Sequence, residues 1–330
     1  MKKKLILIVL IISSILLTSC SDKNTTLFTD KSVKEESADI TKKYNSYVEA
    51  SNIMNDVLNQ SLNYYYKSFG LDINNFEPEE KAFVTSSVSS FNVDLIQEKL
   101  SFYDNEPIIE NLDSAAKNLE PTIVELANII NDIKIYYDSK SYVDDDFKEG
   151  RELHTKLCTS YENYYQKKET FFVPLMELSY EESEKAMENY LKNNELIKYH
   201  SIDYMVTALD LFTELKSQNI DNENPTVDSG KFAEQYKILS EKINELVDAV
   251  NNSKNEEINQ FEQSNFNKFI SYTQETKGAA AQISQDLNEG NLSIKSLNEF
   301  YKNYRTMIHY YNRVVQFSNN IDNLNYFPVI

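Results

Sequence analysis

Apolar residues recur at spacings of three and four along most of the chain from residue 41 onward. This spacing places them on one face of an α-helix, and a helix with such a face buries it against other elements. The pattern is clearest in the first such segment, where the positions are Tyr44, Tyr47, Val48, Ser51, Met54, Asn55, Leu58, Leu62, Tyr65 and Phe69. Gly70 follows at once, as expected for a helix C-terminus. The pattern therefore predicts a long helix ending at Phe69.

The same period predicts further helices over 81–102, 112–137, 147–165, 181–217, 232–250, 261–287 and 297–315. Pro121 predicts a kink or a break, Pro174 predicts the end of a helical region, and 181–217 fits one helix or two in series. No segment alternates with a period of two, and only 5 Gly and 6 Pro are present to build strand connections. We expect an all-α fold, an antiparallel helical bundle of roughly seven to nine helices.

The N-terminus has the features of an export signal. Lys2–Lys4 form a basic start, and the apolar run Leu5–Leu17 is 13 residues long. A helix needs about 20 residues to cross a bilayer, so this run predicts a signal peptide over 1–19. Leu17, Thr18 and Ser19 precede Cys20 in the manner of a bacterial lipobox, which predicts Cys20 as the lipid-attachment site. The alternative is a simple signal peptide that is cut elsewhere.

The predicted organisation follows from this processing. Residues 20–38 are polar and predict a lipidated flexible tether, and 39–330 predict the helical domain. The stretch 219–230 collects turn residues, Pro225 and Gly230, and marks a possible break between two sub-bundles. We expect the protein in the bacterial cell envelope, lipid-anchored and facing outside the cytoplasm. Its membrane would be the cell membrane where there is one membrane, with the outer membrane possible where there are two.

Charge limits the classes of partner. The chain has 33 Lys+Arg and 52 Asp+Glu, a net charge of -19. Such a chain is repelled by nucleic acid and by anionic headgroups, so we expect no nucleic-acid partner and membrane attachment through lipid alone. A protein or small-ligand partner is left open. Once Cys20 carries lipid, Cys158 has no cysteine to pair with inside the chain.

Tyrosine is unusually frequent, with 23 Tyr and no Trp. Our interpretation is that the rings line the seams between helices, with hydroxyls at the edge. A rim for glycan or partner binding is the alternative.

Two short stretches are similar to the YiiG-like family of bacterial lipoproteins, a family of unknown function. The first is Lys43–Val48, and the second runs from Tyr142 to His154 with Asp144, Asp145, Gly150 and Leu153 between them. The resemblance implies an all-helical, membrane-anchored domain. It implies no activity and no role for the residues of either stretch.

His154 and Cys158 are the pair most suggestive of metal chemistry, because residues four apart share a helix face. No further ligand accompanies them in the sequence, so we interpret them as a hydrogen-bonded histidine and a buried cysteine, and we expect no metal site and no cofactor. Asp144–Asp146 lack the glycine that a calcium loop needs, since Glu149 stands there. These aspartates predict a helix N-terminus. His200 and His309 are interpreted as isolated helix-face residues.

No nucleophile motif, zinc-protease motif or phosphate-binding glycine loop is present, and there are only 3 His. The leading hypothesis is a non-enzymatic envelope protein with an interaction or assembly role. One alternative is a ligand- or metal-capturing lipoprotein that serves a transporter, which predicts convergent polar groups in a cleft. The other is an unrecognised hydrolase, which predicts a cleft with a carboxylate or histidine of perturbed pKa.

Overall fold

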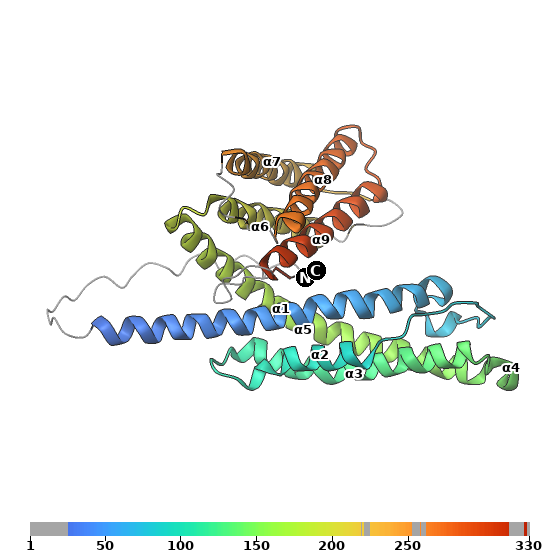
Figure 1. The fold of residues 1–330 in the computed structure, drawn as a ribbon. Helices are drawn as coiled ribbons and strands as arrows, with labels where there is room; N and C mark the ends of the chain where they lie inside the picture. Colours follow the sequence, from blue (N-terminus) through green and yellow to red (C-terminus); the bar gives the residue numbers. More distant parts are fainter. Residues whose placement is uncertain are drawn as a thin grey trace, which may run out of the picture. The chain divides into compact units, whose positions relative to one another are not determined.

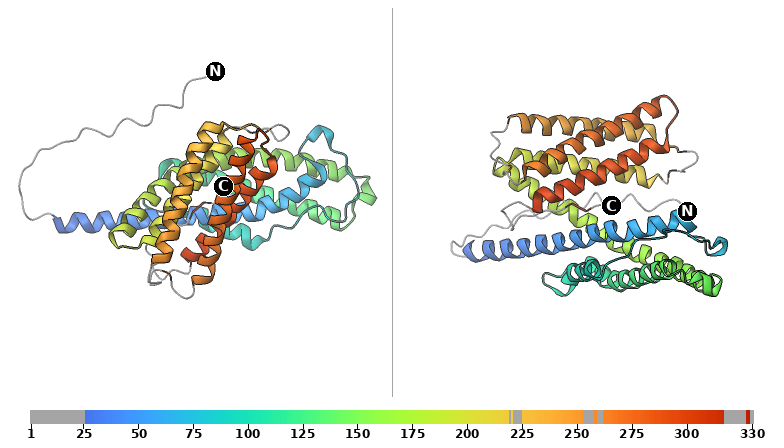
Figure 2. Two further views of the ribbon diagram at one scale, coloured as in Figure 1. Left: turned by 90° about the horizontal axis from the view of Figure 1, so that it is seen from above. Right: turned by 45° about the vertical axis from the view of Figure 1, so that its right-hand side comes forward.

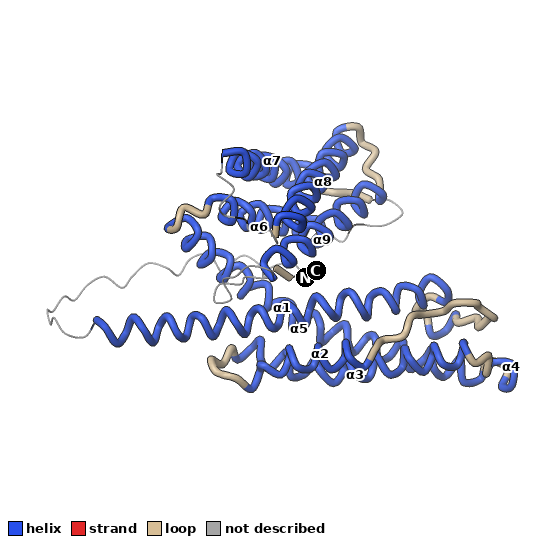
Figure 3. Tube along the Cα trace, viewed as in Figure 1, coloured by secondary structure: helices blue, strands red, loops and turns tan. Residues whose placement is uncertain are grey.

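The computed structural model describes residues 26–218, 220, 225–252, 258, 262–316 and 327–328, with side chains from residue 38 onward. Across these residues the chain forms nine α-helices and no strand (Figures 1 and 3), which confirms the all-α prediction. None of the described helices is both long and apolar enough to cross a membrane. The predicted signal peptide, the lipobox and Cys20 lie outside the described residues.

The first helix, α1 (Thr26–Phe69), begins earlier than the apolar period indicated. Residues 26–37, which fall in the predicted tether, are helical. No glycine or proline interrupts 26–69, so once the buried part of the helix forms, nothing in the sequence ends it on the N-terminal side.

Helix α1 packs antiparallel to α5 (Lys148–Lys192). Side-chain hydrogen bonds link the two helices at four levels, and the partner's number on α5 falls as the number on α1 rises. The pairs are Thr41–Glu182, Tyr44–Ser179, Asn55–Lys168 and Tyr65–His154. Helix α3 (Glu110–Asp138) completes the first hydrophobic core with residues such as Leu119, Ile123 and Ile130.

Prolines do not break these helices. Pro121 lies inside α3 and Pro174 inside α5, so the predicted helix end at Pro174 is wrong. A proline removes one main-chain hydrogen bond. Phe171 and Leu175, both fully buried beside Pro174, supply packing that offsets this loss and keeps the helix continuous.

The predicted helix over 81–102 is shorter than expected. Helix α2 (Ser90–Leu100) begins after Ser89, whose side chain accepts a hydrogen bond from the Asn92 N–H. The short 3₁₀ helices η1 (Ile73–Asn75) and η2 (Ser101–Asp104) lie on either side of it in the sequence. The segment before α2 is held by Asn131 of α3, which bonds both the N–H and the C=O of Val88, at 2.8 and 2.9 Å.

A second hydrophobic core lies among α6 (Leu196–Ser217), α7 (Ser229–Asn252), α8 (Gln263–Asn288) and α9 (Ile294–Gln316). Segment 181–217 is two helices in series, because α5 ends at Lys192 before a turn at Asn194, which has φ 58°. Helix α5 belongs to both cores, with Leu178 in the first and Ala186 in the second. Figure 2 shows helices α6–α9 (yellow to red) grouped together. Stretch 219–230 instead joins two helices of the second core.

Tyrosine rings fill both cores, as the seam interpretation predicts. Six are among the largest fully buried side chains: Tyr44, Tyr47, Tyr65, Tyr164, Tyr204 and Tyr304. Several hydroxyls find partners inside the core and not at its edge; that of Tyr204, for example, donates to the Thr273 carbonyl at 2.7 Å.

Candidate functional site

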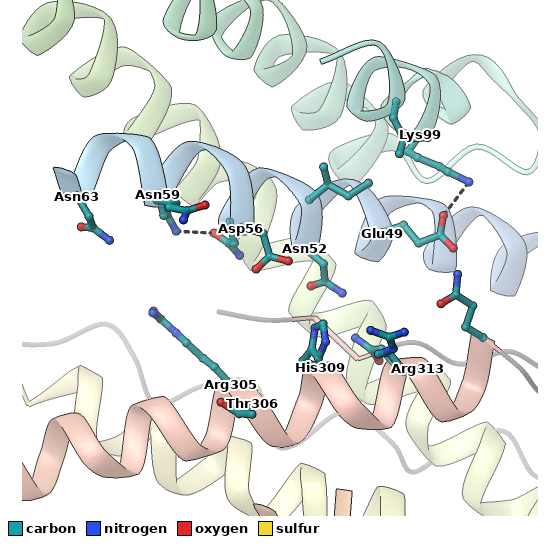
Figure 4. A pocket seen from close by; sticks show the side chains of 16 residues that line it. Glu49, Asn52, Asp56, Asn59, Asn63, Lys99, Arg305, Thr306, His309 and Arg313 are labelled. Atoms are coloured by element: carbon teal, nitrogen blue, oxygen red, sulfur yellow. Dashed lines mark hydrogen bonds and ion pairs between the residues drawn. The ribbon is translucent and has the colours of Figure 1, made fainter. Parts of the chain in front are cut away.

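A groove of about 870 Å³ lies between α1 and α9 (Figure 4). Its lining is polar apart from Ile53 and Leu95, which is unusual for a ligand pocket, where apolar side chains normally predominate. The polar lining residues are Glu49, Asn52, Asn55, Asp56, Asn59, Gln60, Asn63, Lys99, Arg305, Thr306, His309, Asn312, Arg313 and Gln316.

Helix α1 contributes a row of amides to the groove. Asn52, Asn55, Asn59 and Asn63 follow one another at spacings of three and four, so they share one helix face. Within the row, Asn59 Nδ2 donates to Asn55 Oδ1 at 3.2 Å. Each amide offers both a donor and an acceptor, so this face can bind ligands that carry hydroxyl or amide groups.

Helix α9 contributes cationic groups. Arg305, His309 and Arg313 are four residues apart and extend toward α1 (Figure 4). The chain has three arginines in all, and two of them line this groove. Guanidinium groups form paired hydrogen bonds with carboxylates and phosphates, which points to a ligand with such a group.

Asp56 is a carboxyl group on the α1 side of this groove. Burial by the surrounding protein raises its pKa, and the nearby charge of His309 opposes that shift. Glu49, also on α1, instead forms an ion pair with Lys99 at 2.7 Å.

Phe327, near the C-terminus, lies against two groove residues. Asn312 bonds its main-chain N–H and C=O, both at 2.7 Å, and Asn52 Nδ2 lies 3.4 Å from the same carbonyl oxygen. The Phe327 ring is buried in the second core. These contacts tie α1 and α9 together beside the groove.

The second family-like stretch does not reach the groove; it builds the corner between α4 (Tyr142–Asp145) and α5. The Asp145 carboxylate accepts from the Glu149 N–H at 2.7 Å and from the Tyr136 hydroxyl at 2.8 Å, and these bonds lower its pKa. The ring of Tyr142 stacks on that of Phe147 at 4.9 Å. Asp144 is exposed.

Further along this stretch, Gly150 and Leu153 are buried. A Cβ at Gly150 would lie 3.0 Å from the Tyr136 ring, so a side chain there would need that ring to move. Glycine at this position therefore permits close helix packing.

His154 is a buried, hydrogen-bonded residue. Its Nδ1 lies 2.9 Å from the Tyr65 hydroxyl, and its ring stacks on Phe76 at 4.0 Å. Nε2 lies 3.3 Å from the Asp72 carbonyl oxygen and 3.5 Å from Cys158 Sγ. Burial lowers the pKa of His154 and raises that of Cys158.

The first family-like stretch is also structural. Lys43 is fully buried, and its Nζ contacts Asp113 Oδ2 at 2.9 Å and the Asn105 carbonyl at 2.6 Å. The Tyr47 hydroxyl donates to the other Asp113 oxygen, and the Ile109 N–H donates to Oδ2 at 2.7 Å. This network fixes α1 against the start of α3.

One cluster with metal-ligand geometry occurs in the described part of the chain, and it does not include His154. His200 and Asp203 of α6 lie with Glu245 of α7, their ligand atoms within 4.8 Å of one another, so the interpretation of His200 as isolated is wrong. Lys242 Nζ already bridges the two carboxylates, at 2.9 and 3.0 Å, and these bonds raise its pKa. The ammonium group thus occupies the place that a cation would take.

A family model described as a protein of unknown function (DUF3829) matches residues 38–320. The chain belongs to this family. It is also similar to the uncharacterised protein YiiG of Escherichia coli (strain K12), with 23% identity over 118 residues, which is 36% of this chain and 34% of YiiG. These matches confirm the YiiG-like resemblance, although the aligned part spans only about a third of YiiG. No solved structure matches the chain.

The groove was not predicted from the sequence. Its signal is present there in two forms: asparagines at helical spacing along α1, and two of the three arginines on one face of α9. Neither is recognisable as a site until the fold places α1 beside α9.

Proposed function

We propose that this protein is a lipid-anchored, non-enzymatic binding protein of the bacterial cell envelope, and that the groove between α1 and α9 holds a hydrophilic ligand with at least one acidic group. The observation that carries the proposal is the groove lining, in which amides of one helix face arginines of another. Such a lining favours a ligand that is hydrogen-bonded along its length and acidic in part.

The lipobox supports the location. A protein anchored through Cys20 on the outer side of a bacterial membrane would meet cell-wall glycopeptides, which carry hydroxyl, amide and carboxylate groups. The groove chemistry suits this class, and we propose it as the ligand.

The binding test is calorimetric titration of the mature chain with muropeptides from muramidase-digested cell wall. We expect saturable binding, and we expect Arg313→Gln to weaken it about tenfold by removing a groove-facing guanidinium. Lys302→Gln is the matched control, because Lys302 is an exposed cation on the same helix outside the groove lining. Equal affinity in both variants, or no binding by the wild type, would contradict the proposal.

The anchoring test uses the full chain in bacterial cells. Wild type should incorporate labelled palmitate and fractionate with membranes, whereas Cys20→Ser should do neither. Palmitate incorporation by Cys20→Ser would show that Cys20 is not the attachment site.

Asp56 favours a second candidate, a hydrolase. Its raised pKa and its position in the groove would suit a general acid. In that case wild type would release reducing ends from cell-wall glycan and Asp56→Asn would not, although it would still bind muropeptides. Binding without release by the wild type leaves the non-enzymatic proposal in place.

A further inference from the structure

Two asparagine side chains of the described chain each hold the main chain of one non-helical residue. Asn131 Oδ1 accepts from the Val88 N–H and Asn131 Nδ2 donates to the Val88 carbonyl, at 2.8 and 2.9 Å. Asn312 pairs with Phe327 in the same way, with both contacts at 2.7 Å. In an extended chain the N–H and C=O of one residue point to the same side, so one side-chain amide can satisfy both groups.

The second of these pairs lies beside the groove. Asn52 Nδ2 donates to the same Phe327 carbonyl at 3.4 Å, and both Asn52 and Asn312 line the groove. Pro328 follows Phe327, and a residue before proline favours extended backbone. Main chain of this kind is therefore already bound by groove residues, at the Asn52 end of the groove.

The rest of the α1 face has the spacing that an extended peptide needs. Asn55, Asn59 and Asn63 recur every four residues, which is a rise of about 6 Å for each step along a helix. Two residues of extended chain span about 6.6 Å, so every second residue of a peptide would lie opposite an asparagine. Asn59 is half-buried and Asn63 is exposed, and both line the groove (Figure 4). We name Asn52, Asn55, Asn59 and Asn63 the amide row.

The chemistry of the amide row favours a peptide over a sugar. Each side-chain amide presents one donor and one acceptor group, which match the N–H and C=O of one extended residue. A sugar hydroxyl can bond either group but does not present this pair at a fixed repeat. From Asn55 to Asn63 is about 12 Å, the length of about four extended residues.

We propose that the amide row binds a peptide in extended conformation, with asparagine side chains paired to its main-chain N–H and C=O groups. This inference rests on the proposed function and assigns one part of the ligand to one part of the groove. The row takes the peptide stem of the cell-wall glycopeptide, and the glycan lies outside the row. Because the main chain is what the row contacts, the side chains of the peptide can vary.

The test titrates three probes into the mature chain by calorimetry: muropeptides, the free stem peptides released from them by an amidase, and the disaccharide without peptide. We expect the stem peptides to keep most of the muropeptide affinity and the disaccharide not to bind. Asn59→Ala and Asn63→Ala should each weaken stem-peptide binding about fivefold, because each removes hydrogen bonds to the peptide main chain. Asn118→Ala is the matched control, since Asn118 is an exposed asparagine of α3 outside the groove lining.

A second measurement separates direct contact from a structural effect of these variants. Synthetic stem peptides are methylated at one main-chain nitrogen at a time, which removes one N–H donor. We expect wild type to lose affinity at alternate residues of the peptide. Each methylation that weakens binding to the wild type should cost less in the asparagine variant that faces it. Circular dichroism of each variant checks that the helices are intact.

The inference is overturned if the stem peptides do not bind, or if Asn59→Ala, Asn63→Ala and Asn118→Ala bind them alike. Methylation losses without alternation would also overturn it. Failure here is distinguishable from failure of the proposed function. Muropeptide binding that needs Arg313 and is reproduced by the disaccharide would keep the proposed function and remove the peptide assignment. Stem-peptide binding that needs Asn59 but is unchanged in Arg313→Gln would keep the amide row and remove the arginine contact from the proposed function.

Discussion

At the residue scale, a few buried polar groups account for the stretches that resemble the family. Lys43 and Asp113 form an ion pair with almost no solvent exposure, and main-chain and tyrosine groups satisfy their remaining bonds. Such a pair contributes little compared with well-packed apolar residues, but removing one member leaves an unpaired charge in the core. The polar residues of the stretch Lys43–Val48 therefore serve to stabilise the fold and to position α1 against α3.

Asp113→Asn tests this directly. We expect it to lower the free energy of unfolding by about 3 kcal/mol, because Lys43 would then be a buried charge without a counter-ion. Asp138→Asn is the control, since Asp138 pairs with Lys134 on the surface at 2.6 Å and such pairs contribute at most about 1 kcal/mol. Urea denaturation measures both. Equal losses of unfolding free energy in the two variants would show that the buried ion pair stabilises the fold no more than the surface pair does.

His154 makes stability depend on pH. Its pKa is lowered by burial, so the unfolded chain binds this proton more readily than the folded one. The contribution of neutral His154 to the free energy of unfolding is complete above pH 6.5, the ordinary histidine pKa. It is lost as the pH falls from there through the lowered pKa. We expect His154→Gln to have a flatter decline in urea midpoint between about pH 7.5 and about pH 5 than wild type.

At the element scale, helix identity follows from periodicity, whereas several boundaries depend on contacts distant in the sequence. The apolar period predicts each main helix. It could not show that α5 continues past Pro174, which depends on the packing around that proline. It also could not show that α2 begins only at Ser90. The second difference arises because Asn131, over 40 residues later, holds the main chain of Val88 in an extended segment. The groove was not predicted for the same reason: its two walls, α1 and α9, are far apart in the sequence and lie side by side only in the folded chain.

Asn131→Ala tests this link. The change leaves the N–H and C=O of the buried residue Val88 without a partner, so we expect a loss of about 2 kcal/mol. We also expect faster hydrogen exchange over residues 84–88. Asn118→Ala on the same helix is the control, because Asn118 is exposed and its side chain donates to the Ser114 carbonyl one turn away. Unchanged exchange at Val88 would mean that the segment is held by its apolar contacts alone.

At the scale of the described helical unit, residues 38–330 contain two cores that share α5, and the groove lies between a helix of each. Its width therefore depends on whatever fixes α1 against α9. Contacts of the described residues that contribute to this include the bonds of α1 along α5, the continuation of α5 into the second core through α6, and the bonds of Asn52 and Asn312 to the main chain of Phe327. The last of these joins the two walls directly.

Phe327→Ala tests whether this contact holds the groove together. Loss of the buried ring should lower the free energy of unfolding by about 3 kcal/mol. Because the ring anchors the main chain that both walls bind, we expect faster exchange in α1 around Asn52 and in α9 around Asn312, together with weaker muropeptide binding. Phe91→Ala, which removes a ring that is 71% exposed, should change none of these. If faster exchange were confined to α9, the C-terminal contact would be a stabiliser of the second core alone, and the spacing of the groove walls would have to come from α5.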